Sequence, residues 1–438
     1  MPRLVVVALA VAGMLFAAPA ANAAGVDYNH NAVIFVHGFV GSGAQFESQK
    51  LRFTSNGYPD SYVTVFEYDS TTALATEPVL FAQLDQLIAH MQSVTHRPQV
   101  DLLAHSLGTK LMQDYLTSSP QRAATVGHYV NIDGQTASSP PGGVPTLAVW
   151  ASKGPTATPG RSIGGAENVT IPDVTHVQCA TSSLSFWWYY DFFNGKPPAT
   201  TQIMPQSGQI TLSGRAVLFP NNTGMDGSTV QVWAINQATG RRTSSAPIAS
   251  FLIDQTGDWG PVAVTSGRRY EFTLVRPGVP LHHFYYEPFI RSDHLIRLLE
   301  SDALRSAGGP PDPRSVAMVI IRYKEFWGDQ GSENDILTLN GLNVCNANTC
   351  PIKQLVNGVF AGDFDHDQAS NLSQPWPTYS NIPFLTGVDV YMPAESPPTG
   401  QVTVGLVSRS VGPERTLTFP DFPGTTDVET VQLNDFEQ

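Results

Sequence analysis

Charged residues are scarce in this sequence, and basic clusters are missing from it. Only 14% of the 438 residues are charged, and 24 basic residues face 37 acidic ones. Because no Lys- or Arg-rich run is present to neutralise phosphates, nucleic acid is excluded as an expected partner. Hydrophobic residues make up 42% of the chain, beside 37 glycines and 34 prolines. This composition favours a globular protein rich in strands or loops, and the length predicts two or three domains.

Cysteine is also scarce, with three residues in the chain. Cys345 and Cys350 flank a four-residue segment and could close a small disulfide in an oxidising compartment. A metal site is less favoured, because neither a second cysteine pair nor a nearby histidine completes four ligands. Cys179 has no partner in the sequence, and we expect a small buried residue there.

Long hydrophobic runs are missing after the N-terminus. Arg3 precedes an apolar run over residues 4–20, and an Ala-Asn-Ala sequence ends at Ala23. This order is typical of a secretory signal peptide, so we expect residues 1–23 to be removed and the product to be secreted, extracellular or periplasmic. An uncleaved membrane anchor is the alternative, since the run approaches the roughly 18 residues that span a bilayer.

Residues 24–198 alternate short β-branched runs with longer segments. This pattern is typical of β-α-β units, so we predict a mostly parallel sheet with helices on both faces. The expected strands lie at 33–36, 63–68, 100–104, 128–132 and 146–150, and a helix is expected at 77–94.

Beyond residues 194–198 helical periodicity becomes scarce and short alternating strands separated by turn residues take over. We predict a β-sandwich module over 207–278 and a second β-rich module over 279–438. One helix is expected at 294–305.

Ser106 is the candidate nucleophile. A serine at a strand-to-helix turn needs small residues two positions before and after it, because the turn crowds its neighbours. Ala104 and Gly108 stand at these positions, and the apolar strand 100–104 leads into them. A helix-capping serine is the alternative, which the preceding strand makes less favoured.

Backbone amides are the candidate oxyanion donors. Acyl transfer needs N–H groups directed at the developing negative charge, one after the nucleophile and one from an early loop. Leu107 follows the serine, and Phe39 lies in a His-Gly-Phe sequence directly after the strand 33–36. The alternative for this loop is an ordinary glycine-rich turn.

A serine nucleophile needs a histidine base and an acid that orients it. His176 follows the last strand-like run, as the chain order Ser, acid, His requires. The usual acid position after the strand 146–150 holds no carboxylate, whereas Asp133 ends the neighbouring strand, and we assign it. An Asp-Gly turn is the alternative role for Asp133. Asp173 is the competitor, but lies only three residues before His176 and is expected to bond local backbone.

The motifs His37-Gly38-Phe39, Ala104-His105-Ser106-Leu107-Gly108, Ile132-Asp133-Gly134 and Thr175-His176-Val177-Gln178 together resemble a known family. They are similar to α/β-hydrolase lipases and carboxylesterases of the prokaryotic, archaeal-lipase-like type, which carry an all-β C-terminal extension. The resemblance implies ester hydrolysis without a metal or organic cofactor, with the acid one strand earlier than usual. It also implies a lipid or other acyl-ester substrate, engaged as acyl chain or lipid surface by the C-terminal region.

Two weaker patterns complete the reading. Asp363, Asp365 and Asp367 alternate like a calcium loop, but Gln368 and Gln374 replace the expected Gly and Glu, so we predict a turn and no metal. The aromatic segment 186–193 is expected to pack against the sheet.

The sequence therefore predicts a secreted serine ester hydrolase that forms an acyl-enzyme. Ser106 attacks, His176 transfers the proton, Asp133 holds the imidazole, and the Phe39 and Leu107 amides stabilise the oxyanion. Two alternatives stay open. The same triad could serve a polyester depolymerase or an amidase, and the protein could be a non-catalytic surface-binding protein with a vestigial hydrolase domain.

Overall fold

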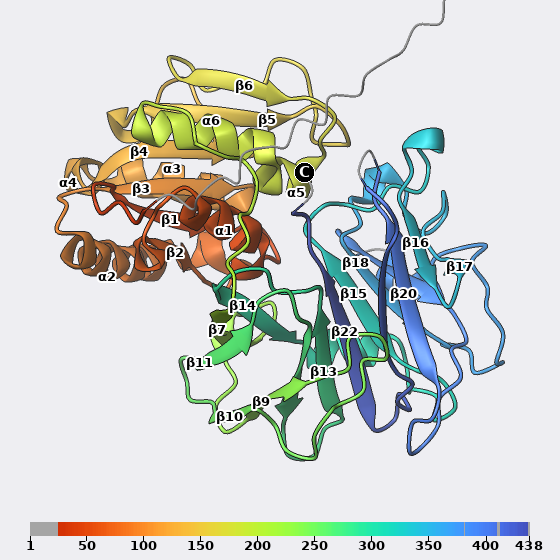
Figure 1. Cartoon of the computed structure of the whole chain (residues 1–438). Coiled ribbons are helices and arrows are strands. Elements are labelled where there is room, and N and C mark those ends of the chain that lie inside the picture. Colours follow the sequence, from red (N-terminus) through yellow and green to blue (C-terminus); the bar gives the residue numbers. More distant parts are fainter. Residues whose placement is uncertain (1–24, 381, 410–411, 437–438) are drawn as a thin grey trace, which may run out of the picture.

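The computed structural model describes residues 25–380, 382–409 and 412–436, so the expected signal peptide lies outside the described residues. An N-terminal α/β domain and a C-terminal β-rich region lie side by side (Figure 1). Within the described ranges, no helix has the length and apolar character to cross a membrane.

The α/β domain is built on a parallel sheet of six strands in the order β2-β1-β3-β4-β5-β6. Strand β1 is buried at every position, as expected for an internal parallel strand covered on both faces. The strands are β1 (Ala32–Val36), β2 (Val63–Phe66), β3 (Val100–His105), β4 (Val126–Ile132), β5 (Thr146–Ala151) and β6 (Glu167–Ile171).

Helices cover both faces of this sheet, which confirms the predicted α/β architecture. Residues of α2 and α3, such as Leu84 and Leu111, share one core with the sheet, and residues of α1 and α6, such as Phe53 and Phe186, share the other. The aromatic segment thus packs against the sheet, as predicted. The helices are α1 (Glu47–Ser55), α2 (Glu77–Thr95), α3 (Leu107–Ser118), α4 (Pro120–Ala124), α5 (His176–Thr181) and α6 (Ser183–Asn194).

The β-rich region contains a sheet of eight strands in the order β10-β9-β12-β13-β22-β15-β18-β19. One end of it packs on the sheet β11-β7-β14, and the other end packs on the sheet β17-β16-β20-β21. The first strands are β7 (Gln209–Leu218), β8 (Thr223–Gly224), β9 (Thr229–Ala234), β10 (Ala249–Leu252), β11 (Asp258–Thr265), β12 (Tyr270–Val275), β13 (Leu281–Tyr286) and β14 (Asp293–Glu300). The later elements are α7 (Asp302–Ala307), β15 (Met318–Arg322), β16 (Ile336–Leu339), β17 (Leu342–Asn343), β18 (Gly358–Gly362), α8 (Pro377–Ser380), β19 (Leu385–Asp389), β20 (Gln401–Val407), β21 (Arg415–Pro420) and β22 (Asp427–Leu433).

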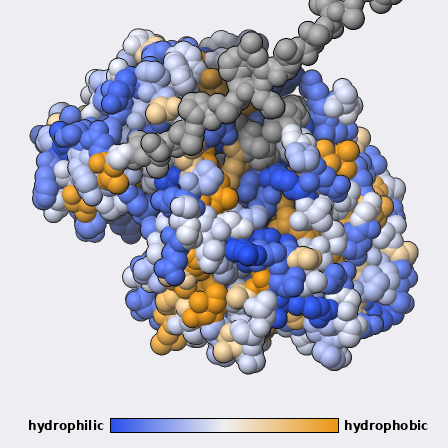
Figure 2. Space-filling model, in the orientation of Figure 1, coloured by the Kyte–Doolittle hydropathy of each residue, from blue (hydrophilic) through white to orange (hydrophobic). Residues whose placement is uncertain are grey.

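The final strand, β22, ties the two ends of the region together, because it pairs in parallel with both β13 and β15. Hydrophilic side chains cover much of the face in Figure 2. Hydrophobic side chains gather on this face near β10, where Ile248 and Leu252 are 44% and 78% exposed.

Three expectations for this region differ from the structure. The helix expected at 294–305 is wrong, because its first part is the strand β14 and only α7 is helical. Leu298 packs between the sheet β11-β7-β14 and the eight-stranded sheet, and Leu295 packs against the α/β domain. Burial on both faces of β14 produces a nearly continuous apolar run, which resembles a helical pattern. Strands β13 and β14, which the sequence placed in the second module, pair with β12 and β7 of the first module.

The third difference concerns the cysteines. Cys345 and Cys350 are buried free thiols and do not form a disulfide.

Candidate active site

The candidate nucleophile lies at a sharp turn between β3 and α3. Ser106 has φ 54° and ψ −124°, a conformation that non-glycine residues rarely adopt and that is typical of a strained functional turn. A Cβ atom at Gly108 would lie 2.5 Å from the carbonyl oxygen of His37, so only glycine fits there. The local sequence therefore makes the tight turn possible.

Ser106, His176 and Asp133 form a hydrogen-bonded series. The Nε2 atom of His176 lies 2.9 Å from Ser106 Oγ, and its Nδ1 atom lies 2.5 Å from Asp133 Oδ2. His176 begins α5, and Asp133 follows β4. The three residues come from separate parts of the domain, and the sheet brings them to one edge.

The carboxylate of Asp133 is fully satisfied by its surroundings. Burial on its own raises the pKa of Asp133, but the hydrogen bond and charge of His176, followed by the charge of Arg161, hold it below its usual range. The Oδ1 atom accepts from Arg161 Nη1 at 2.6 Å and from the backbone N–H of Ala151 at 2.9 Å. The Oδ2 atom also accepts from the hydroxyl of Thr156 at 2.8 Å.

Asp173 is not brought to the histidine. Its side chain is 80% exposed and lies 3.5 Å from Lys153 Nζ. Sequence reasoning missed Arg161 and Thr156, which lie in the loop after β5. The sequence offered one indirect signal. The loop after β5, where the acid usually lies, contains hydrogen-bond donors such as Thr156 and Arg161 and no carboxylate at the expected position.

The loop after β1 lies against the nucleophile. A Cβ atom at Gly38 would lie 2.7 Å from Ser106 Cβ, so this close approach requires glycine. Phe39 follows it and is 45% exposed at the edge of the pocket. Leu107 is the first residue of α3, where a backbone N–H has no acceptor within the helix. Leu107 is thus adjacent to Ser106 in the chain, and Phe39 follows the glycine that approaches Ser106 closely.

Residues of the β-rich region contact the loop after β1 and the strand end next to it. Asn222 Nδ2 donates to the carbonyl oxygens of Gly41 at 2.9 Å and Tyr68 at 3.2 Å. Glu67 Oε1 accepts the backbone N–H of Gly43 at 2.8 Å and is paired with Arg297 at 2.8 Å. No local sequence signal reveals these contacts, because Asn222 and Arg297 lie far along the chain from the loop.

His105 supports the backbone of His176. Its Nε2 atom lies 3.0 Å from the carbonyl oxygen of His176, and its Nδ1 atom lies 2.8 Å from Gln45 Nε2. Burial lowers the pKa of His105 well below its usual range, and the charge of His176 adds to this effect. A neutral His105 can accept from Gln45 and donate to the carbonyl oxygen.

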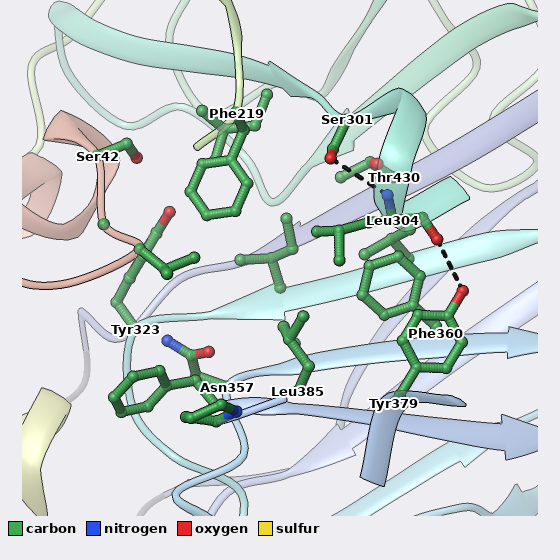
Figure 3. A pocket seen from close by; sticks show the side chains of 18 of the residues that line it. Ser42, Phe219, Ser301, Leu304, Tyr323, Asn357, Phe360, Tyr379, Leu385 and Thr430 are labelled. Carbon is green, nitrogen blue, oxygen red and sulfur yellow. Dashed lines mark hydrogen bonds between the residues drawn. The ribbon is translucent and has the colours of Figure 1, made fainter. Parts of the chain in front are cut away.

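Ser106 lines a largely apolar pocket whose other walls come mostly from the β-rich region. Ser42, Phe39 and His176 line it on the side of the α/β domain. In Figure 3, Phe219, Leu304, Phe360, Tyr379 and Leu385 surround the hollow, all contributed by the β-rich region.

One acidic cluster could hold a cation. Ligand oxygens of Asp363, Asp365 and Asp367 lie within 4.8 Å of one another. Burial, followed by the charges of these three carboxylates, raises the pKa of nearby Asp389 to about 6. The sequence predicted a turn at this position, and carboxylate oxygens of this kind suit calcium.

Comparisons with known proteins agree with this architecture. Residues 30–129 match the family model Lipase (class 2), residues 208–303 match the model Lipase C-terminal domain, and residues 309–437 match a further model for a C-terminal domain. No curated protein matches the sequence.

The chain also matches solved structures over part of its length, and two of them are named as a lipase and as a hydrolase. Lipase B of Aspergillus fumigatus is 14% identical with a TM-score of 0.30, and the match covers 41% of this chain and 56% of that protein. A predicted CIB-like hydrolase from Thermoplasma acidophilum is 16% identical with a TM-score of 0.30, over 39% of this chain and 89% of that one. The chain thus spans little more than half the length of the first of these structures.

Proposed function

Because the chain belongs to the lipase-type α/β-hydrolases, we propose that it is a secreted serine esterase that forms an acyl-enzyme. One observation carries the proposal. The imidazole of His176 bridges Ser106 Oγ and the Asp133 carboxylate by hydrogen bonds at the mouth of an apolar pocket. This is the arrangement that activates a serine hydroxyl for attack on an acyl carbon.

In the proposed acylation step, Ser106 Oγ attacks the ester carbonyl while His176 Nε2 takes its proton. The ionised Asp133 stabilises the imidazolium that forms and keeps the ring oriented. The amides of Phe39 and Leu107 donate to the oxyanion of the tetrahedral intermediate. His176 then gives its proton to the departing alcohol, and Ser106 remains acylated.

Deacylation repeats these roles with water. His176 removes a proton from the attacking water, the same amides stabilise the second oxyanion, and the proton returns to Ser106 as the acid leaves. The chain's own residues thus supply every group that this cycle needs, and the cycle uses no metal or organic cofactor.

The pocket supports an acyl chain as the substrate part bound beyond the ester. Its walls in the β-rich region are mainly aliphatic and aromatic, which favours apolar chains over polar groups. We therefore propose a lipid or other acyl ester as substrate, with the β-rich region binding the chain. The basic start, apolar run and Ala-Asn-Ala ending of residues 1–23 support secretion.

The test is Ser106→Ala, assayed with p-nitrophenyl esters from acetate to palmitate and with a fluorophosphonate probe. We expect hydrolysis of all esters and probe labelling to vanish, while the thermal melting transition stays. Normal turnover by the variant would contradict the mechanism. A wild type that hydrolyses anilides or insoluble polyester in preference to these esters would instead favour an amidase or a depolymerase.

A further inference from the structure

The loop after β15 reaches from the β-rich region to the backbone that follows His176. Glu325 Oε1 accepts the N–H of Val177 at 2.5 Å, and Oε2 accepts the N–H of Gln178 at 3.0 Å. These are the two residues directly after the candidate base. A carboxylate nearly 150 residues away in sequence therefore contacts the segment on which the position of His176 depends.

Glu325 replaces a missing local cap. The first N–H groups of a helix have no acceptor within it, and a side chain at the preceding residue usually supplies one. Thr175 occupies that position in α5, but its side chain makes no capping hydrogen bond. Glu325 is completely buried, and a buried carboxylate is costly unless hydrogen bonds satisfy it. The two amides meet this need, so each side satisfies the other.

Arg409 extends the same contact. Its Nη2 atom donates to Gln178 Oε1 at 2.5 Å, and its Nη1 atom donates to the main-chain oxygen of Glu325 at 2.5 Å. Asp335 Oδ2 accepts from the same Nη1 atom at 2.5 Å, and the guanidinium carbon lies 3.9 Å from the Trp327 ring centroid. Buried networks whose members are hydrogen-bonded to one another restrict movement, so Glu325 has a rigid support.

The backbone around His176 is thus held at two points. His105 of the α/β domain lies against its carbonyl oxygen, and Glu325 holds the amides that follow. The Phe384 ring, also from the β-rich region, lies parallel to the imidazole with centroids 6.2 Å apart. Movement of α5 by a fraction of an ångström would change both hydrogen bonds of the imidazole.

We infer that Glu325 is a positioning residue for the proposed ester hydrolysis, which holds His176 between Ser106 and Asp133 through the amides of Val177 and Gln178. The β-rich region then completes the active site as well as lining the pocket. This inference rests on the proposed function, since it assigns Glu325 a role in that reaction.

The test compares Glu325→Gln with Glu287→Gln. Glu287 is a matched control, because it is also a buried carboxylate of the β-rich region that accepts a backbone N–H, that of Asn434 at 2.6 Å, and it is not among the residues that line the pocket beside Ser106. With p-nitrophenyl butyrate, we expect Glu325→Gln to lower kcat about 10- to 100-fold, because small errors in the placement of a catalytic group are costly. KM should stay within about twofold, and the acid limb of the pH–rate profile should shift, because the imidazole's partners are displaced. Glu287→Gln should keep the wild-type kcat and profile.

Glu325→Asp covers the case in which Glu325→Gln loses its melting transition. It keeps the charge but withdraws the carboxylate by one methylene, and we expect a smaller loss of kcat in the same direction. Rates are expressed per active site titrated with the fluorophosphonate. A kcat equal to that of Glu287→Gln in the folded Glu325 variants would overturn the inference. If wild-type hydrolysis survives Ser106→Ala, the proposed function fails first, so the two failures are distinguishable.

Discussion

The α/β domain and the β-rich region both contribute to the same pocket, but they do so in different ways. In the α/β domain the candidate reacting groups follow the ends of parallel strands, as Ser106 follows β3 and Asp133 follows β4. In the β-rich region the residues that contact the candidate site's backbone or the His176 ring, Asn222, Glu325 and Phe384, lie in loops. Under the proposed function, the first region supplies the reacting groups, whereas the second supports their geometry and encloses the acyl chain. Changes in the two regions should therefore have different kinetic signatures.

The largest effect is expected within the α/β domain, from Asp133→Asn. The amide cannot stabilise the imidazolium and favours the wrong tautomer of His176, so kcat should fall about 10³- to 10⁴-fold. Asp173→Asn is the control, because this exposed carboxylate has no contact with His176 and should leave the rate unchanged. Steady-state kinetics on p-nitrophenyl butyrate measure both. A loss confined to Asp173→Asn would reverse the assignment of the acid.

Local sequence was sufficient to find the residues that are proposed to react. A strand, a small residue, a serine and a glycine lie next to one another in the chain, so the turn at Ser106 could be recognised before the structure. The strand order then places Asp133 and His176 at the same sheet edge. The positions of these residues follow from a regular architecture with a strong hydrophobic pattern.

The supporting contacts could not be read in this way. Glu325 contacts the α5 amides only because the β-rich region folds back on the α/β domain, and neither Glu325 nor Val177 carries a motif. The helix expected at 294–305 failed for the same reason. Leu295 and Leu298 are buried against different neighbours, so tertiary packing decides the structure of this segment over local periodicity.

The second expected effect is on the free energy of unfolding. It arises from ion pairs between Glu67 of the α/β domain and arginines of the β-rich region. Burial on its own raises the pKa of Glu67, but the charges of Arg297 and Arg215 from the β-rich region lower it to about 2, against an ordinary value of 4.5. A carboxyl whose pKa is lower in the folded state stabilises the fold above its unfolded pKa. That contribution, about 3 kcal/mol, is lost as the pH falls from about 5 towards 2.

Glu67→Gln should therefore destabilise the protein at pH 7 and make its unfolding free energy less sensitive to acid than that of the wild type. Denaturant unfolding between pH 7 and pH 3 measures this, with the exposed Glu333→Gln as control. Equal acid sensitivity of Glu67→Gln and the wild type would mean that the ion pairs contribute nothing to holding the two regions together.

Blocking the pocket inside the β-rich region should have the smallest effect on the rate with short esters. With long esters the effect should be large, so the change selects by chain length. Val319 lies on β15 and lines the pocket, while its neighbour Ile320 points into the core of the region. Val319→Trp should leave hydrolysis of p-nitrophenyl butyrate nearly unchanged, since we expect the short acyl chain to end before β15. Excluding three or four methylenes at about 0.8 kcal/mol each should lower kcat/KM for p-nitrophenyl palmitate by about 100-fold. Val275→Trp, at a partly exposed position on β12, controls for the added indole. Equal losses on both esters would mean that Val319 acts on the reacting groups, and the division between a chemical and an enclosing region would then be wrong.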